Sequence, residues 1–171
     1  EDEDEDEDED EGNWMKQEVE MDADAADVFA IAGDLAHYGR WAGTGIERVV
    51  VKERTEGSAE AEYRAGAFGY SFDFSLAFTF QPPTRISFRI LRSPAIRRLD
   101  GAYWLEEAGA GRCRVGFKVC AELGAFVPQF VQTAIANLII AIALGELKKY
   151  MESPSVQAHL DELRDTPRRE Q

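Results

Sequence analysis

The sequence predicts an α+β domain in which a curved antiparallel sheet of about seven strands wraps around one long C-terminal helix. Three observations support this. Apolar and polar residues alternate with a period of two over most of residues 46–123, as in strands with one buried face. Short helical segments precede this region, and a long apolar segment follows it. Consecutive strands joined by short turns favour an antiparallel meander, whose apolar face the long helix can cover.

The N-terminal part of this domain is predicted to be one strand followed by two short helices. Residues 14–22 alternate and form the strand. Asp22 or Asp24 then offers an N-cap for a helix over AADVFAIAGDL, residues 25–35. A second helical turn is expected over LAHYGRWAG, residues 35–43, where glycines end it.

Six further strands are predicted in succession, and residues 70–80 give the clearest of them. Strict alternation over eleven residues places one apolar set on a single face: Tyr70, Phe72, Phe74, Leu76, Phe78 and Phe80. The other strands are expected near residues 46–54, 58–68, 86–90, 99–105 and 113–121. Alternation also places Asp73 and Asp100 on the outer face.

The long helix is predicted to begin near Pro128 and to end at about Glu152, before Ser153 and Pro154. Its charged last turns predict that four residues face the sheet: Ile140, Leu144, Leu147 and Met151. If the solvent-facing side of these last turns continues toward the N-terminus of the helix, it exposes Val131, Ile135, Leu138 and Ile142. The polar residues of the first turns favour the opposite orientation of the helix about its axis.

Either rotation leaves one apolar stripe of this helix uncovered. Such a stripe favours contact with a membrane surface, a second subunit or a partner protein. The alternative is that a strongly curved sheet buries more of the helix. The apolar stretch is too interrupted to predict a membrane span.

The chain divides into an acidic tail over residues 1–12, a domain over residues 13–153 and a charged C-terminal tail over residues 154–171, for which a short helix and a frayed end are both open. Residues 1–11 hold eleven of the 33 acidic residues, so this tail is expected to be disordered. It would serve either as a solubilising spacer or as a segment that attracts the basic surface of a partner. The rest carries 22 acidic against 19 basic residues, a net charge of −3. This balance excludes nucleic acid as the expected partner.

Cysteine and histidine usage predicts neither a disulfide nor a metal site. Cys113 and Cys120 lie seven residues apart on one predicted strand and point to opposite faces. Free thiols favour a reducing compartment, so we expect an intracellular protein, soluble or peripherally membrane-associated. With only His37 and His159, and no Cys-x-x-Cys, no metal or other cofactor is predicted. His37 is expected at the surface.

The order of elements resembles the START-like, helix-grip (SRPBCC) superfamily over residues 14–153. Three segments carry the resemblance: DLAHYGRW, SPAIRRLDGAYWLEE and VPQFVQTAIANLIIAIALGELKKYME. The closer likeness is to its polyketide cyclase/dehydrase and coenzyme Q-binding START-type branch. The resemblance implies a helix-grip fold with a cavity for lipids, isoprenoid quinones or aromatic polyketides. Trp41 matches an aromatic residue common after the second short helix, but the proline that often follows is replaced by Ala42-Gly43.

We expect twelve residues to line this cavity: Tyr38, Trp41, Tyr63, Phe72, Phe74, Leu76, Phe88, Tyr103, Phe117, Asn137, Ile140 and Leu144. For each phenylalanine the alternative is plain core packing. The Tyr63 and Tyr103 hydroxyls could bind a quinone carbonyl or lipid head group, or else backbone or water. Asn137 either faces inward, paired with a ligand oxygen, or faces solvent.

The expected function is binding or carriage of a hydrophobic small molecule, a lipid or a prenylated quinone. The sequence offers no nucleophile with a base at a recognisable spacing, so no catalytic residue is predicted and an enzyme is not favoured. Two alternatives remain open. One is an aromatase/cyclase acting on a polyketide-like chain. The other is an interaction module that uses the terminal helix and the acidic tail.

Overall fold

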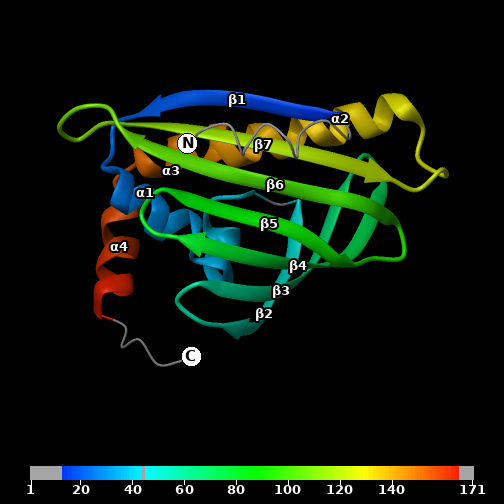
Figure 1. Ribbon diagram of the computed structural model, residues 1–171, viewed down its shortest axis with the longest axis horizontal. Coiled ribbons are helices and arrows are strands. Elements are labelled where there is room, and N and C mark those ends of the chain that lie inside the picture. The colour runs from blue at the N-terminus through cyan, green and yellow to red at the C-terminus, as the bar shows by residue number, and fades with distance from the viewer. Residues whose placement is uncertain (1–12, 44, 166–171) are drawn as a thin grey trace.

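The computed structural model describes residues 13–43 and 45–165 (Figure 1). Seven strands form one antiparallel sheet in the order β1-β7-β6-β5-β4-β3-β2. The strands are β1 Trp14–Met21, β2 Ile46–Arg54, β3 Ser58–Ala67, β4 Tyr70–Gln81, β5 Arg85–Arg92, β6 Ile96–Glu107 and β7 Cys113–Leu123. Strands β2 to β7 form the predicted meander, and β1 closes its far edge against β7.

Two short helices follow β1 and one long helix follows β7. The short ones are α1 Ala25–Ala32 and the 3₁₀ helix η3 Leu35–Arg40. The long helix comprises α2 Gln129–Ile140, the π-helical η4 Ala141–Glu146 and α3 Leu147–Met151, and α4 Ser155–Asp165 follows it. The sheet curves, and the long helix runs along its concave face (Figure 1). This arrangement confirms the predicted helix-grip fold.

Alternation along β4 gives the sheet its apolar inner face. Phe72, Leu76, Phe78 and Phe80 are buried, whereas the intervening Asp73 is exposed. Antiparallel register then brings aromatic residues of neighbouring strands side by side, because directly paired residues share a face. Three such cross-strand pairs lie on the inner face: Tyr63 with Phe74, Phe78 with Phe88, and Tyr103 with Phe117.

The long helix buries more of its surface than a flat sheet would cover. Ile140, Leu144, Leu147 and Met151 are buried, as predicted. Val131 and Ile135, which one rotation expected to be exposed, are also buried. Phe130 in the first turn is exposed, and after it the exposed positions are small or polar: Thr133, Asn137, Ala141, Gly145 and Lys149. The curvature of the sheet explains the difference, and the solvent side carries no continuous stripe of large apolar residues.

By length and composition alone, the 23-residue helix Gln129–Met151 is apolar enough to cross a membrane. Its most apolar window is 39% buried within the structure, against the concave face of the sheet. A helix gripped by a sheet needs an apolar face for that contact, so its composition carries no membrane assignment.

The C-terminal segment forms a short helix, α4, which is one of the two forms expected for it. Val156, His159 and Leu160 of α4 are buried, and α4 packs against α1 and α3 (Figure 1). The folded unit therefore extends beyond the predicted boundary at residue 153 to at least Asp165. The predicted acidic tail, residues 1–12, lies outside the described residues.

Candidate ligand-binding cavity

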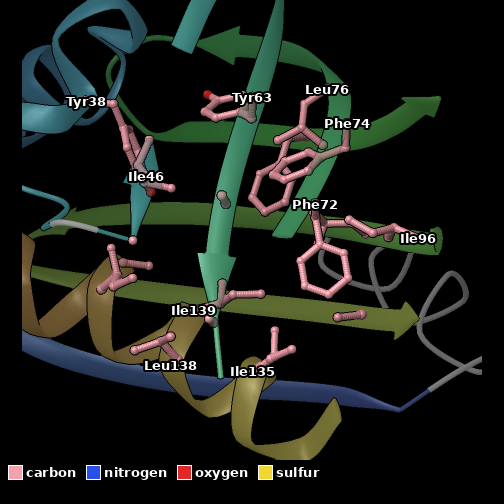
Figure 2. A pocket seen from close by; sticks show the side chains of 18 of the residues that line it. Tyr38, Ile46, Tyr63, Phe72, Phe74, Leu76, Ile96, Ile135, Leu138 and Ile139 are labelled. Atoms are coloured by element: carbon pink, nitrogen blue, oxygen red, sulfur yellow. The ribbon is translucent and has the colours of Figure 1, made fainter. Parts of the chain in front are cut away.

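A hollow of about 160 Å³ lies between the concave face of the sheet and the long helix (Figure 2). A single buried water needs roughly 10–15 Å³ by this kind of measure, so the hollow exceeds the space of a few waters. An apolar cavity of about 150 Å³ in another protein stays dry and binds benzene. The hollow is therefore large enough for a compact hydrophobic ligand.

The wall of this cavity is made almost entirely of aliphatic, aromatic and glycine residues. Eight of the twelve predicted residues line it: Tyr38, Tyr63, Phe72, Phe74, Leu76, Phe88, Tyr103 and Phe117. The helix contributes a wall that was not predicted, which consists of Ile135, Leu138, Ile139, Ile142 and Ala143. Their spacing of three or four residues defines one helix face. Most of the apolar stripe that had no partner in the sequence analysis thus faces the cavity.

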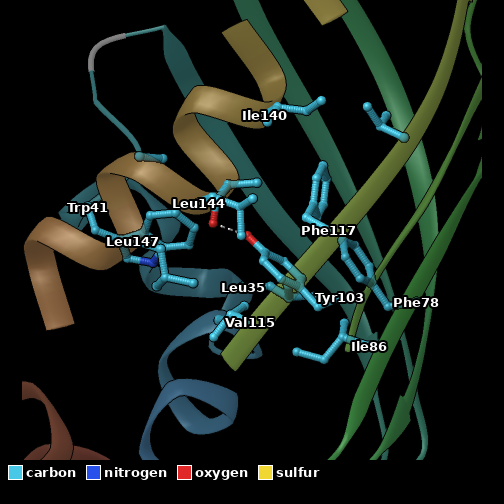
Figure 3. Close-up of a cluster of buried hydrophobic side chains, with 14 of the residues drawn as sticks. Leu35, Trp41, Phe78, Ile86, Tyr103, Val115, Phe117, Ile140, Leu144 and Leu147 are labelled. Atoms are coloured by element: carbon cyan, nitrogen blue, oxygen red, sulfur yellow. Dashed lines mark hydrogen bonds between the residues drawn. The ribbon is translucent and has the colours of Figure 1, made fainter. Parts of the chain in front are cut away.

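Four predicted residues do not line the cavity. Trp41 is buried behind it, with its ring 4.6 Å from the ring of Tyr38. Ile140 and Leu144 pack into solid core near Leu147 (Figure 3). Asn137 is exposed and lies on the same outer helix face as Thr133 and Ala141, so it cannot reach a ligand as one alternative proposed.

Three phenols are the only polar side chains among the residues that line the cavity. The Tyr103 hydroxyl donates a hydrogen bond of 2.9 Å to the Ala143 carbonyl in the π-helical turn (Figure 3). Within the described chain, the Tyr38 and Tyr63 hydroxyls have no hydrogen-bond partner. Their rings meet edge to face, with centroids 6.2 Å apart. In Figure 2, Tyr38 enters from η3 and Tyr63 from β3.

Burial keeps all three phenols neutral. It raises the pKa of Tyr38 from 10.0 to about 12. Burial raises the pKa values of Tyr63 and Tyr103 as well, and the neighbouring phenols add to this effect. At neutral pH each hydroxyl therefore retains its proton and can donate or accept a hydrogen bond.

Carboxylates stay outside the cavity, as alternation predicted for Asp73 and Asp100. Asp73 is exposed and pairs with Arg64 at 3.0 Å, and Asp100 pairs with Arg98 at 2.9 Å. Both cysteines are free and buried, and burial raises the pKa of Cys113 to about 11. The cavity wall therefore presents no group that is ionised at neutral pH.

A second hollow of about 520 Å³ has a different character. It includes charged and polar residues of β2 to β5: Arg48, Glu62, Arg64, Asp73, Ser75, Arg92 and Ser93. Oppositely charged side chains are mixed along it, and it is open to solvent. It does not enclose a ligand.

One cluster could hold a metal ion. Asp34 Oδ2 accepts hydrogen bonds from His37 Nδ1 at 2.8 Å and from His159 Nε2 at 2.7 Å, and His159 Nδ1 lies 2.8 Å from the Tyr150 hydroxyl. The ligand atoms of the Asp34, His37 and His159 trio lie within 4.8 Å of one another. The two short contacts are hydrogen-bond distances, and they join α4 to η3, which carries Tyr38. His37 is exposed, as expected, whereas His159 is buried.

Solved structures share this architecture at low sequence identity. A START superfamily protein from Mycobacterium smegmatis is 16% identical, with a TM-score of 0.72 over 82% of this chain and 98% of that chain. The ZhuI aromatase/cyclase from Streptomyces sp. R1128 is 15% identical, with a TM-score of 0.63 over 90% and 94%. A STAR-related lipid transfer protein from Xanthomonas axonopodis is 17% identical, with a TM-score of 0.65 over 82% and 86%. These likenesses show the fold.

Sequence comparison identifies the family. A search of curated proteins found no match to this chain. The profile of the family described as polyketide cyclase / dehydrase and lipid transport matches residues 15–152, which span the sheet and the long helix. The predicted membership in the START-like superfamily is confirmed, while the narrower coenzyme Q-binding branch stays a prediction. The chain belongs to the polyketide cyclase/dehydrase and lipid transport family.

Proposed function

We propose that this protein binds and carries an uncharged, hydrophobic small molecule in the cavity between the sheet and the long helix. One observation carries the proposal: none of the 26 residues that line the cavity is charged. Burying about 200 Å² of apolar ligand surface, at roughly 25 cal/mol per Å², contributes roughly 5 kcal/mol before the costs of association. Such a ligand needs no charged anchor.

The size of the cavity narrows the ligand class. About 160 Å³ suits a compact ring system or a short chain. A prenylated quinone would place its ring inside, and its tail would need more room than the cavity provides. Within the predicted group of lipids and quinones, we therefore favour a ligand of one or two rings.

A cyclase is the second candidate function. The family description and the name of the ZhuI neighbour support it, and the free Tyr38 and Tyr63 hydroxyls could orient a substrate carbonyl. General acid–base catalysis works best with a group whose pKa lies near the working pH. The phenols that line this cavity have raised pKa values, so the binding role has the stronger support.

A carrier also needs a surface at which it collects its ligand. Phe68, Phe126 and Phe130 are 58%, 59% and 77% exposed. Phe126 lies 6.2 Å, ring to ring, from Tyr70, next to the turn that holds Phe68. We place the proposed membrane contact at these three residues, the phenylalanine patch, because the exposed side of the long helix is small or polar beyond Phe130.

Dye binding tests the carrier proposal. The purified full chain should increase the fluorescence of N,N-dimethyl-1-naphthylamine, a neutral apolar dye with two rings, and a matching hydrophobic ligand should displace it. Leu138→Trp fills the cavity from the helix wall and should weaken dye binding at least about tenfold, a loss of about 1.4 kcal/mol. Ala141→Trp, on the exposed face of the same helix, should bind the dye as the parent does. Equal affinities for both variants, or a parent that ignores the dye, would refute the proposal.

A further inference from the structure

Two free phenols distinguish the cavity from a simple apolar hollow. Tyr103 has a backbone partner, so its hydroxyl has a structural role. Tyr63 is only 6% exposed, yet within the described chain its hydroxyl and that of Tyr38 have no hydrogen-bond partner. Among the described residues, the fully buried side-chain polar atoms without a partner are the indole nitrogens of Trp14 and Trp41. The Tyr38 and Tyr63 hydroxyls are not among these sealed atoms, and both residues line the cavity, where a ligand can reach them.

The two rings are held in place by other aromatic residues. Phe74 stacks on Tyr63, with centroids 5.3 Å apart and ring planes within 8° of parallel. Trp41 packs against Tyr38 at 4.6 Å. The Tyr38 and Tyr63 rings meet edge to face, with centroids 6.2 Å apart, and both residues line the same cavity. Side chains fixed in this way form a preorganised polar site.

We propose that Tyr38 and Tyr63 together bind one oxygen atom of the ligand, a carbonyl or hydroxyl on a hydrophobic ring frame. Both hydroxyls can donate to the two lone pairs of a carbonyl oxygen, or one can donate while the other accepts from an alcohol. The inference rests on the proposed binding function and specifies its ligand class.

The same site disfavours a carboxylate. Neither phenol carries a positive charge, and no lysine, arginine or histidine lines the cavity. An ionised group moved from water into such a wall would lose its hydration without gaining a counter-charge. The cavity therefore selects neutral oxygenated molecules over both free acids and plain hydrocarbons.

A matched ligand series tests this inference. Tetralin, α-tetralone and 1,2,3,4-tetrahydro-1-naphthoic acid share a two-ring frame and differ in the polar group. Their affinities would be measured by displacement of N,N-dimethyl-1-naphthylamine from the full chain. We expect α-tetralone to bind roughly five- to tenfold more tightly than tetralin, as one or two net hydrogen bonds allow. The acid should bind more weakly than α-tetralone.

Tyrosine-to-phenylalanine variants assign the effect to the two hydroxyls. Tyr38→Phe and Tyr63→Phe should each weaken α-tetralone binding roughly five-fold, the effect of one hydrogen bond. Their affinity for tetralin should stay at the parent level, which also shows that the variants are folded. Tyr70→Phe removes a phenol that does not line the cavity and should change neither affinity.

The outcomes separate the two proposals. If tetralin binds but α-tetralone binds no better, or if the variants lose both ligands equally, the two-phenol site is refuted and the binding function stands. If neither ligand nor the dye binds the parent, both proposals fail. Preference for α-tetralone that disappears in Tyr38→Phe and Tyr63→Phe, and persists in Tyr70→Phe, supports the inference.

Discussion

The two ends of the space between the sheet and the long helix differ in packing. At the α3 end, α1 and η3 fill the space, and Leu144 and Leu147 are 1% and 0% exposed beside Trp41 (Figure 3). At the α2 end, Leu138 and Ile139 are only partly buried, and they line the cavity with Phe72 (Figure 2). The same alternating sheet supplies both ends.

The difference teaches where a cavity in this fold comes from. Alternation turns one face of each strand inward at both ends, but a curved sheet leaves more space than one helix can fill. At the α3 end, Val28 and Ile31 of α1 occupy that extra space. No equivalent element among the described residues covers the α2 end, and there the aromatic side chains become a wall.

The largest expected effect lies in the filled end. Leu147→Ala removes a fully buried side chain and should lower the free energy of unfolding by about 3 kcal/mol, through lost transfer energy and a new void. Ile139→Ala, at the hollow end, should cost about 1 kcal/mol, because its side chain already borders empty space. Urea unfolding of both variants measures the two losses. Equal losses would contradict the proposed difference in packing.

The next largest effect is the loss of stability at alkaline pH that ionisation of the Tyr38 phenol causes. Its pKa in the folded state is raised from 10.0 to about 12, so its contribution is fully present below pH 10 and is lost as pH rises from 10 through 12. Two pKa units correspond to about 2.7 kcal/mol. Tyr38→Phe should therefore lose less stability than the parent between pH 9 and 12. Parallel curves for the two proteins in urea titrations would count against this.

A slightly smaller effect is expected at the junction that holds η3. His159→Ala removes a buried imidazole and leaves the Asp34 carboxylate and the Tyr150 hydroxyl without this partner, so it should cost about 2 kcal/mol. His37→Ala removes the exposed partner of the same carboxylate and should cost less than about 1 kcal/mol. Thermal and urea unfolding of both variants provide the comparison. A larger loss for His37→Ala would show that the buried contact is not the main link.

Features that depend on a few neighbouring residues could be predicted from the sequence, whereas features that depend on the whole fold could not. The inner face of β4 depends only on alternation, so Phe72, Leu76 and Phe78 were placed correctly. The side of the long helix that faces inward depends on the curvature of the whole sheet. Ile135 and Leu138 were therefore missed as lining residues, and Asn137 was assigned inward as well as outward.

Contacts between distant segments were harder to predict. His159 meets Asp34 only because α4 folds back onto α1. The charged composition of residues 154–171 allowed a short helix but did not indicate that the helix would pack against the domain. The roles of the three phenols depend likewise on tertiary structure. Tyr103 finds its acceptor in a π-helical turn, which no local pattern indicates, and Tyr38 and Tyr63 find none within the described chain.

The smallest effect on stability, and the clearest effect on membrane contact, is expected at the phenylalanine patch. Replacing Phe126 and Phe130 together by serine should change the free energy of unfolding by less than about 0.5 kcal/mol, because both side chains are largely exposed. The same replacement removes apolar surface from the hollow end of the molecule. Flotation with phosphatidylcholine vesicles should recover several-fold less of the double variant than of the parent.

Asn137→Ala is the matched control, since it changes an exposed residue on the long helix and leaves the phenylalanine patch intact. It should float with the vesicles as the parent does. If the double variant also floats undiminished, the membrane contact does not lie at this end. If only the double variant fails to float with the vesicles, the end of the molecule that holds the cavity is also the end that contacts the membrane. A ligand could then pass from the membrane to the cavity without crossing the filled end.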